Sequence, residues 1–479
     1  MKNINIKSIS MNSISIKNIS IKKLFKSEII EKIIILTASL ILIYLLGSLY
    51  FANHFYFNTV INGVNLSLKA HKDAEHIIKS YIKSYELQLI EKDGQIEIIT
   101  RQNIGMQYNQ NNSIKNIYNI QNSFKWISSF FKSQKYYVND LYVYNKDYLR
   151  DKINELDCLN RDIIEPKNVE FRYSNGYYEM IKEINGNKII KDKLLAAIKI
   201  NIVKGIKRLD LDDKLCYENP KYTLKTDKSL KTMKLLNKYV STKIIYKFGS
   251  EIELLDGNII NEWLIVDENL EVVISKTAVV KYVKGLRKKY DTVGITRKFK
   301  TSTGKIVEVK GGLYGWKINQ DAETKALLEN INRGEVIEKE PIYAQKALYR
   351  DKNDIGNTYV EINITRQYLW FYKEGKLITQ GFVVTGNPNK GNATVVGTYM
   401  LNYKRKGETL SGRGYEVKVS YWMPFYGNIG LHDASWRSSF GGEIYKRRGT
   451  HGCVNAPLYL AKIVFENIEE GIPIISYEE

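Results

Sequence analysis

The stretch RRGTHGCVNAP, Arg447 to Pro457, gathers residue types that are scarce in the rest of the chain. It holds one of the three cysteines and one of the five histidines of the 479 residues, Cys453 and His451, with a single glycine between them. Another histidine, His432, lies 21 positions before Cys453. A lone cysteine accompanied by histidines is a candidate for nucleophilic or metal chemistry.

The pattern around this cysteine predicts how the side chains would act. Gly430-Leu431-His432 ends a predicted strand, a loop of seventeen residues follows, and a helix is predicted to start at Pro457. Cys453 would then lie one turn before the positive end of a helix, which favours a thiolate. His432 would take the proton, and backbone N–H groups beside Gly452 would hold an oxyanion. Together these parts indicate acyl transfer.

Two other interpretations use the same residues. His432, His451 and Cys453 are ligand types for zinc, with Asp433 as a possible fourth ligand. Alternatively, Cys453 is a buried small side chain beside a histidine that satisfies a backbone carbonyl. Two of the five histidines lie within 22 residues of this cysteine, which favours catalysis over both alternatives. We therefore expect no metal and no other cofactor.

The sequence around the motif predicts a mostly-β domain over residues 357–477. TYVEINIT alternates apolar and polar residues, and QYLWFYKEGKLITQGF reads as a hairpin with its turn at Glu374-Gly375. GTYMLNYK, YEVKVSYWMPF and PIISY add further strands, and PLYLAKIVFENI is the one helix. A domain of this length lies well within what one hydrophobic core serves.

The N-terminal region predicts a membrane anchor. Residues 33–52, IIILTASLILIYLLGSLYFA, carry no charge and would span about 30 Å as a helix. Seven Lys precede this run, whereas residues 53–70 carry only Lys69, so the basic tail, residues 1–32, is expected to be cytoplasmic. Everything after residue 52 would then face the cell wall. A cleaved signal peptide and a buried core helix are the alternatives.

Composition limits the partners. The net charge of +20 comes from lysines scattered along the chain, and no arginine-aromatic nucleic-acid motif occurs, so we expect no nucleic acid as a partner. Cys158 and Cys216 could pair outside the cell, but two isolated small hydrophobic side chains are the favoured state.

Two α+β segments, residues 58–222 and 230–348, lie between the anchor and the C-terminal domain. The first contains a hairpin with its turn at Asp93-Gly94, and the second contains the hairpin IIYKFGSEIELLDGN followed by the helix TAVVKYVKGLRKKYD. Both end alike, with Gly205 and Gly334 separated by 129 residues and two Ile-Asn pairs, at 184 and 318, separated by 134. These parallels suggest an internal duplication.

The motif with His432 and Thr450 to Asn455 resembles the signature of L,D-transpeptidases with a YkuD-type catalytic domain. VVTGNPNKGNATVVGTY and WMPFYGNIGLH resemble two further segments of that family. FNTVINGVNLS and GLYGWKINQDAE resemble the peptidoglycan-binding domain found upstream of cell-wall transpeptidases. The fold implied is thus a transmembrane helix, two α+β modules and a mostly-β catalytic domain.

The resemblance also implies an activity and residue roles. Cys453 would attack the bond before the terminal D-alanine of a peptidoglycan stem tetrapeptide, and a second stem would receive the acyl group in a 3→3 link. His432 would be the base, His451 and Thr450 would shape the site, and Asn455 would support its loop. Thr450, Asn455 and Val395 stand where the family more often has Ser, Arg and Pro.

Three questions stay open at the level of sequence. Arg447 and Arg448, with Lys446, would either bind stem carboxylates or form a solvated loop. Water as the acceptor would make the protein an L,D-carboxypeptidase. A wall-binding protein with a decayed catalytic domain is the third possibility, against which the intact His432 and Cys453 argue.

Overall fold

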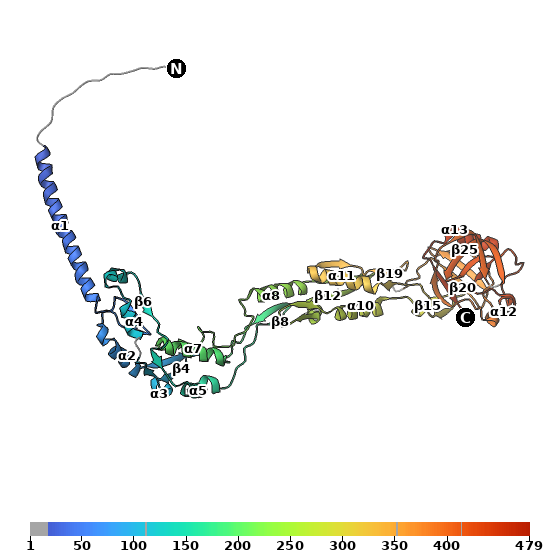
Figure 1. Cartoon of the computed structure of the whole chain (residues 1–479). Coiled ribbons are helices and arrows are strands. Elements are labelled where there is room, and N and C mark those ends of the chain that lie inside the picture. The colour runs from blue at the N-terminus through green and yellow to red at the C-terminus, as the bar shows by residue number, and fades with distance from the viewer. Residues whose placement is uncertain (1–17, 111–112, 351–352, 413) are drawn as a thin grey trace, which may run out of the picture. The chain divides into compact units, whose positions relative to one another are not determined.

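The computed structural model describes residues 18–110, 113–350, 353–412 and 414–479, and it shows a long apolar helix followed by two compact units (Figure 1). The first unit comprises Met1–Val169 with Lys182–Thr223, and the second comprises Glu170–Ile181 with Leu224–Glu479. The helix, α1, runs from Asn18 to Phe51. Within the described residues, its part Glu28–Phe51 is the one helix long and apolar enough to cross a membrane.

The first unit is built around a three-stranded sheet. The hairpin β3 (Glu86–Ile90) and β4 (Ile96–Thr100) turns at Asp93-Gly94 as expected, and β10 (Arg208–Asp210) pairs parallel with β3. Cys158 and Cys216 lie free and buried in this core, so the expectation of isolated cysteines is confirmed. The helices are α2 (Ala74–Lys83), α3 (Arg101–Ile104), α4 (Ser113–Asn119), α5 (Lys146–Asn154), α6 (Asp157–Asn160) and α7 (Lys191–Lys204), and the remaining elements are β1 (Thr59–Ile61), β2 (Val64–Asn65), η1 (His71–Asp73), β5 (Gln107–Tyr108), η2 (Ser123–Phe130), β6 (Gln134–Tyr136) and β7 (Tyr142–Val143).

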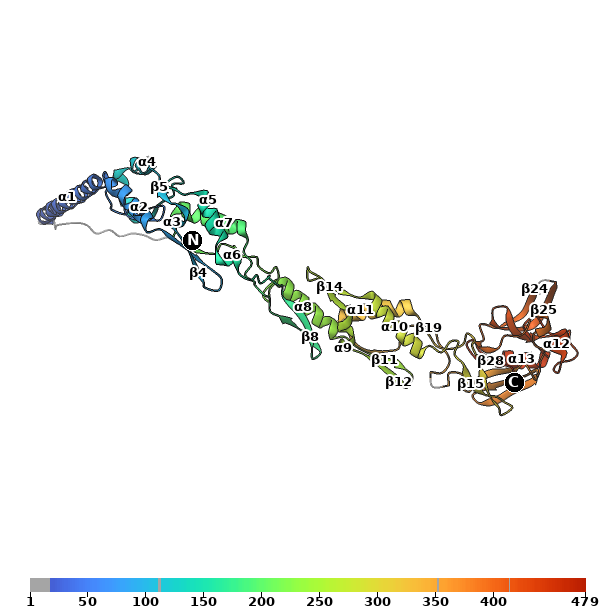
Figure 2. The same ribbon diagram turned by 90° about the horizontal axis from the view of Figure 1, so that it is seen from below.

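The second unit begins with the same arrangement, which supports the duplication. Hairpin β11 (Lys243–Phe248) and β12 (Glu251–Leu255) is joined in parallel by β18 (Val336–Lys339). Helices α7 and α11 (Gln320–Arg333) both precede the parallel strand, and each ends at a left-handed glycine, Gly205 and Gly334. Helices α10 and α11 pack together (Figure 2). The other elements are α8 (Asp227–Val240), α9 (Gly257–Ile260), η3 (Asn261–Trp263), β13 (Leu264–Val266), β14 (Val272–Ile274), α10 (Lys276–Tyr290), β17 (Lys317–Ile318) and β19 (Tyr343–Gln345).

The shared ending is only partly as the sequence suggested. The offset of 129 residues relates α7 to α11 and is structurally meaningful. The Ile-Asn pairs at 184 and 318 are not equivalent. Asn319 caps the start of α11 through its side chain, whereas the residue before α7 is Ile190. Chance similarity therefore accounts for the second offset.

Two hairpins pack across the expected segment boundaries. β8 (Glu170–Ser174) and β9 (Tyr177–Ile181) belong with the second unit, where the Tyr178 N–H donates to Asn237 on α8 over 2.7 Å. β15 (Arg297–Lys300) and β16 (Ile306–Val309) pack on the C-terminal domain rather than on the preceding module. Apolar residues on these hairpins are buried only against those partners, which sequence periodicity cannot identify.

The C-terminal domain is mostly β, as expected, and its core lies between two sheets and one helix. The five-stranded sheet has the order β22-β21-β20-β28-β23, and the four-stranded sheet has the order β24-β25-β26-β27. The long hairpin β24–β25 projects at one end (Figure 2). Strands β24 and β27 were not predicted. The bounds are β20 (Tyr359–Asn363), β21 (Tyr368–Lys373), β22 (Lys376–Phe382), η4 (Pro388–Lys390), β23 (Gly397–Met400), β24 (Arg405–Gly412), β25 (Tyr415–Tyr426), β26 (Ile429–Asp433), α12 (Ile444–Arg448), β27 (Val454–Ala456), α13 (Leu458–Asn467) and β28 (Pro473–Tyr477).

Candidate active site

The pairing of β26 with β27 brings the expected catalytic residues together. The two strands are parallel, with Leu431 opposite Val454 and His432 opposite Asn455. Opposed residues point to the same face of a sheet, and residues two apart along a strand share that face. Cys453, Asn455 and His432 therefore project from one face. A diagonal neighbour in such a sheet is within reach of a long side chain.

The same strand corrects one expectation. Cys453 does not lie one turn before a helix, because the whole of β27 separates it from Pro457, the residue that caps α13. An extended strand advances about 3.3 Å per residue, and the effect of a helix dipole fades within one turn. The front of α13 therefore does not stabilise a Cys453 thiolate.

The surroundings of the Cys453 sulfur favour the neutral thiol. Burial raises the pKa of Cys453, and a hydrogen bond from the Gly430 backbone lowers it by less. The thiol donates to the Asn428 carbonyl over 3.5 Å. The residue is only partly covered overall, so a substrate can approach the sulfur from the cavity that it lines.

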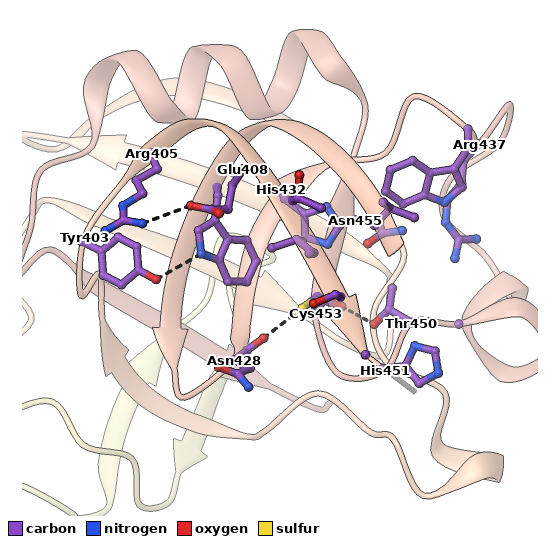
Figure 3. A pocket seen from close by; sticks show the side chains of 18 residues that line it. Tyr403, Arg405, Glu408, Asn428, His432, Arg437, Thr450, His451, Cys453 and Asn455 are labelled. Atoms are coloured by element: carbon purple, nitrogen blue, oxygen red, sulfur yellow. Dashed lines mark hydrogen bonds and ion pairs between the residues drawn. The ribbon is translucent and has the colours of Figure 1, made fainter. Parts of the chain in front are cut away.

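His432 is held as a neutral base. Its Nδ1 lies 2.8 Å from the Asp433 carbonyl oxygen, which can only accept, so Nδ1 carries the proton and Nε2 has a free lone pair. Its ring lies between Trp422 and Trp436, with ring centroids 5.8 and 6.1 Å away. Burial lowers the pKa of His432. Figure 3 shows the His432 ring and Cys453 on the same wall of the cavity.

Thr450 and Gly452 shape the turn that presents Cys453. The Thr450 hydroxyl donates to the Cys453 carbonyl over 2.5 Å and accepts the Gly452 N–H over 3.0 Å. That N–H is therefore engaged and does not serve as an oxyanion donor. Gly452 has φ +122°, a conformation that side chains rarely adopt, which explains the glycine. His451 is exposed and lines the same cavity.

Thr394 is a supporting residue to which the sequence gave no role. It is buried and lies in the segment that resembled the family's glycine-rich stretch. Its hydroxyl donates to the Gly452 carbonyl over 2.7 Å and accepts the Gly386 N–H over 2.9 Å. Thr394 thus connects two distant loops directly behind Cys453.

Asn455 presents an unsatisfied acceptor to the cavity. The residue is buried in β27, and its backbone exchanges two hydrogen bonds of 2.9 Å with Val384. Its side-chain Oδ1 is buried and has no hydrogen-bond partner within the described structure. A buried carbonyl oxygen without a partner is costly, so this atom is poised to accept an N–H from a bound molecule.

A cavity of about 660 Å³ opens over these residues (Figure 3). Arg437 is a cation on its wall, and its Nη2 donates to the Arg448 carbonyl over 2.8 Å. The Nε of Arg437 is buried without a partner within the described residues, and burial, followed by nearby Arg448, lowers the pKa of the guanidinium. A desolvated cation with a spare donor suits a carboxylate.

The two arginines expected to bind substrate lie elsewhere. Arg447 and Arg448 are exposed on α12 and are not among the residues that line the cavity. Lys446 beside them pairs with Glu443 over 2.6 Å. The sequence offered three cations near the motif, but only the path of the loop after β26 shows that a fourth, Arg437, faces the sulfur.

The zinc interpretation gains no support from this geometry. Among the described residues, no group of three or more His, Cys, Asp or Glu side chains is placed to hold a metal ion. The Asp433 carboxylate, considered as a fourth ligand, instead accepts the N–H groups of Ser420 and Tyr421, both over 2.8 Å.

Comparison with protein families assigns most of the chain. The family described as "L,D-transpeptidase catalytic domain" (YkuD) matches residues 357–475. The family described as "Putative peptidoglycan binding domain" matches residues 98–210 and 222–337. Both resemblances drawn from the sequence are therefore confirmed.

Individual relatives agree with the family matches. The crystal structure of a cysteine-to-serine mutant of an Enterococcus faecium L,D-transpeptidase is 31% identical, with a TM-score of 0.44, and the match covers 52% of this chain and all of that one. The Ldtfm–avibactam carbamoyl enzyme is also 31% identical, with 52% and 99% covered and a TM-score of 0.45. "Putative L,D-transpeptidase YciB" of Bacillus subtilis is 24% identical over 32% of this chain and 83% of its own length.

Proposed function

Because the chain belongs to the L,D-transpeptidases with a YkuD-type catalytic domain, we propose that it joins peptidoglycan stem peptides through a thioester on Cys453. The observation that carries this proposal is the register of β26 and β27, which puts Cys453, His432 and Asn455 on one face at an open cavity. A nucleophile, a base and a binding space are the parts that acyl transfer needs.

The first half of the reaction forms the acyl-enzyme. Cys453 Sγ attacks the carbonyl between the third residue of a stem tetrapeptide and its terminal D-alanine, while His432 Nε2 takes the thiol proton. The tetrahedral intermediate collapses, the C–N bond breaks, and His432 returns the proton to the leaving amine. D-alanine departs and a thioester remains.

The second half transfers the acyl group. The side-chain amine of another stem's third residue attacks the thioester and gives one proton to His432. The C–S bond breaks, the Cys453 sulfur regains the proton, and a 3→3 amide link remains. Water as the acceptor would give a tripeptide instead, which is the carboxypeptidase alternative.

The cavity residues supply positioning in this proposal. The Arg437 guanidinium binds a stem carboxylate, and the Asn455 Oδ1 accepts a substrate N–H. Thr450, Thr394 and Gly452 hold the loop of Cys453 in place. Arg447 and Arg448 are not part of this binding site, since α12 presents them to solvent.

The remaining parts place the enzyme at the wall. Helix α1 anchors the chain in the cell membrane with its N-terminus in the cytoplasm, because lysines precede the apolar run. The two α+β modules, within residues 58–222 and 230–348, bind peptidoglycan and keep the C-terminal domain, residues 357–477, on its substrate.

Incubation of the protein with stem tetrapeptides, followed by mass spectrometry, tests the proposal. We expect a cross-linked dimer and free D-alanine from the native chain, and neither from Cys453→Ala. The matched control is Cys216→Ala, which removes a buried thiol of the first unit and should leave dimer formation intact. Tripeptide without dimer would establish the carboxypeptidase, and dimer formed by folded Cys453→Ala would refute the nucleophile assignment.

A further inference from the structure

An exposed apolar segment beside helix α1 has no role in the activity proposed above. We call the segment from Ile120 to Lys132, which contains the 3-10 helix η2, the aromatic foot. Soluble surfaces rarely carry so many large apolar side chains together. The exposed ones are Ile120, Phe124, Ile127, Phe130 and Phe131, with exposed fractions of 75%, 58%, 46%, 51% and 85%.

The aromatic foot is an addition to the duplicated module. In the first copy it lies within the long connection from α3, which ends at Ile104, to α5, which begins at Lys146. The second copy connects the equivalent α9 and α10 over residues 261–275 only. The shared fold is therefore complete without the aromatic foot, and another requirement must account for its apolar surface.

Direct contacts fasten the aromatic foot to one face of α1. The Tyr44 hydroxyl donates to the Phe124 carbonyl over 2.7 Å, and Trp126 Nε1 donates to the Tyr44 carbonyl over 3.2 Å. The Trp126 ring lies so close to Gly47 that a Cβ there would meet it at 2.6 Å, and it stacks on Phe51 with centroids 5.6 Å apart. Positions 44, 47 and 51 share one side of a helix.

These contacts fix the depth of the aromatic foot relative to the apolar helix. Tyr44 and Phe51 are seven residues apart, which is about 10 Å along a helix axis. Segments that lie in a membrane interface bury their apolar face by about 5–10 Å, at the level where Trp and Tyr side chains concentrate. The aromatic foot is therefore level with the last two turns of the proposed span.

The charge of the aromatic foot identifies the kind of surface that it meets. Lys125 and Lys132 are exposed, as is Lys135 just beyond. No acidic residue occurs from Ser113 to Asn139. Basic side chains around an apolar patch are attracted to anionic lipid headgroups.

We propose that the aromatic foot inserts into the outer leaflet of the membrane, at the boundary between anionic headgroups and acyl chains. This rests on the proposed anchoring by α1. The first module is then held against the membrane at two places, the end of α1 and the aromatic foot, instead of turning freely about a single helix.

Site-specific fluorescence on the full chain tests this proposal. In a Cys453→Ala background, the two remaining cysteines are buried, so an added cysteine can be labelled with an environment-sensitive dye. The test position is Phe131→Cys, the control is Tyr148→Cys on α5, which is 56% exposed in the same unit, and the reference within the span is Leu42→Cys, 57% exposed. The protein is reconstituted in phosphatidylglycerol-containing vesicles with brominated acyl chains, which quench dyes inside the bilayer.

We expect loss of emission at positions 42 and 131 and unchanged emission at 148. Replacing phosphatidylglycerol by phosphatidylcholine should weaken quenching at 131 and leave it unchanged at 42. Quenching at 42 without quenching at 131 would overturn the proposal while leaving the anchor standing. No quenching at 42 would overturn the anchor itself, and with it this inference. A dye at 131 that is shielded in proportion to protein density, without quenching by bromolipid, would identify a second copy of the chain as the occupant and equally overturn it.

Discussion

At the scale of single residues, Cys453 and His432 form a neutral thiol–imidazole pair. Burial raises the pKa of the thiol and lowers the pKa of the imidazole, so both shifts oppose a resting ion pair. A thiolate made in advance by a helix dipole is not available here, because β27 lies between Cys453 and α13. The proton therefore moves to His432 during the attack on the substrate.

This neutral pair predicts a distinctive pH dependence. Because the thiolate is the form that reacts with iodoacetamide, alkylation of Cys453 should increase through a pKa above the ordinary thiol value of 9.0. Protonation of His432 removes the base, and its lowered pKa delays this, so kcat/KM should fall only below pH 6.5. Rapid alkylation that is independent of pH near 6 would indicate a resting ion pair and contradict this picture.

The two arginine assignments can be separated by one substitution made at two places. Arg437→Gln should lower kcat/KM for stem peptides by about 10- to 100-fold, since a hydrogen bond to a charged group contributes about 1.5–3 kcal/mol. Arg447→Gln, made on exposed α12, should change it little. The reverse result in steady-state kinetics would restore the assignment drawn from the sequence.

At the scale of elements, the loop that carries Cys453 is positioned by strands on both sides. The Asn387 N–H donates to the Thr450 carbonyl and the Thr450 N–H to the Thr385 carbonyl, both over 3.0 Å. Thr394 adds the contact to Gly452. The nucleophile thus sits on a short connection whose path is set by the segment after β22.

Thr394→Val tests this support, because valine keeps the shape and removes the hydroxyl. Two buried backbone groups, the Gly386 N–H and the Gly452 carbonyl, would lose their partner, at a cost of about 1–3 kcal/mol each. We expect a lower Tm and a lower kcat for the variant. The same change at Thr379, on the edge strand β22, is the control and should alter neither; an unchanged kcat in Thr394→Val would remove Thr394 from the positioning residues.

At the scale of the whole molecule, the second unit does not separate cleanly at the expected domain boundary. Phe299 and Val309 of hairpin β15–β16 pack in one cluster with Ile475 and Tyr477. Buried Glu361 on β20 accepts the Ser302 N–H over 2.9 Å and the Ser302 hydroxyl over 2.6 Å. The hairpin is therefore part of the catalytic domain's core in physical terms.

A comparison of two truncated chains tests this boundary. Residues 291–479 should have a clearly higher Tm than residues 357–479, because the shorter chain exposes the surface that Phe299 and Val309 cover, and burial of each such side chain contributes about 1.5–3 kcal/mol. It also leaves Glu361 without Ser302. Equal Tm values in thermal denaturation would show that the hairpin is only an external attachment.

The sequence by itself determined the local elements and the chemical identity of the site. Strand alternation and the turns at Asp93-Gly94 and Glu374-Gly375 predict hairpins that the structure contains, because side-chain period and left-handed turn residues act over a few positions. The family signature likewise named His432 and Cys453 from their spacing.

Only the tertiary structure decided what depends on pairing between distant segments. The register of β26 against β27 put Asn455 opposite His432 and moved Cys453 away from a helix end. The course of the loop after β26 selected Arg437 over Arg447 and Arg448, and packing assigned β8–β9 and β15–β16 to their neighbours. These outcomes follow from long-range burial and strand pairing, whose free energy is shared between segments that carry no record of each other in the local sequence.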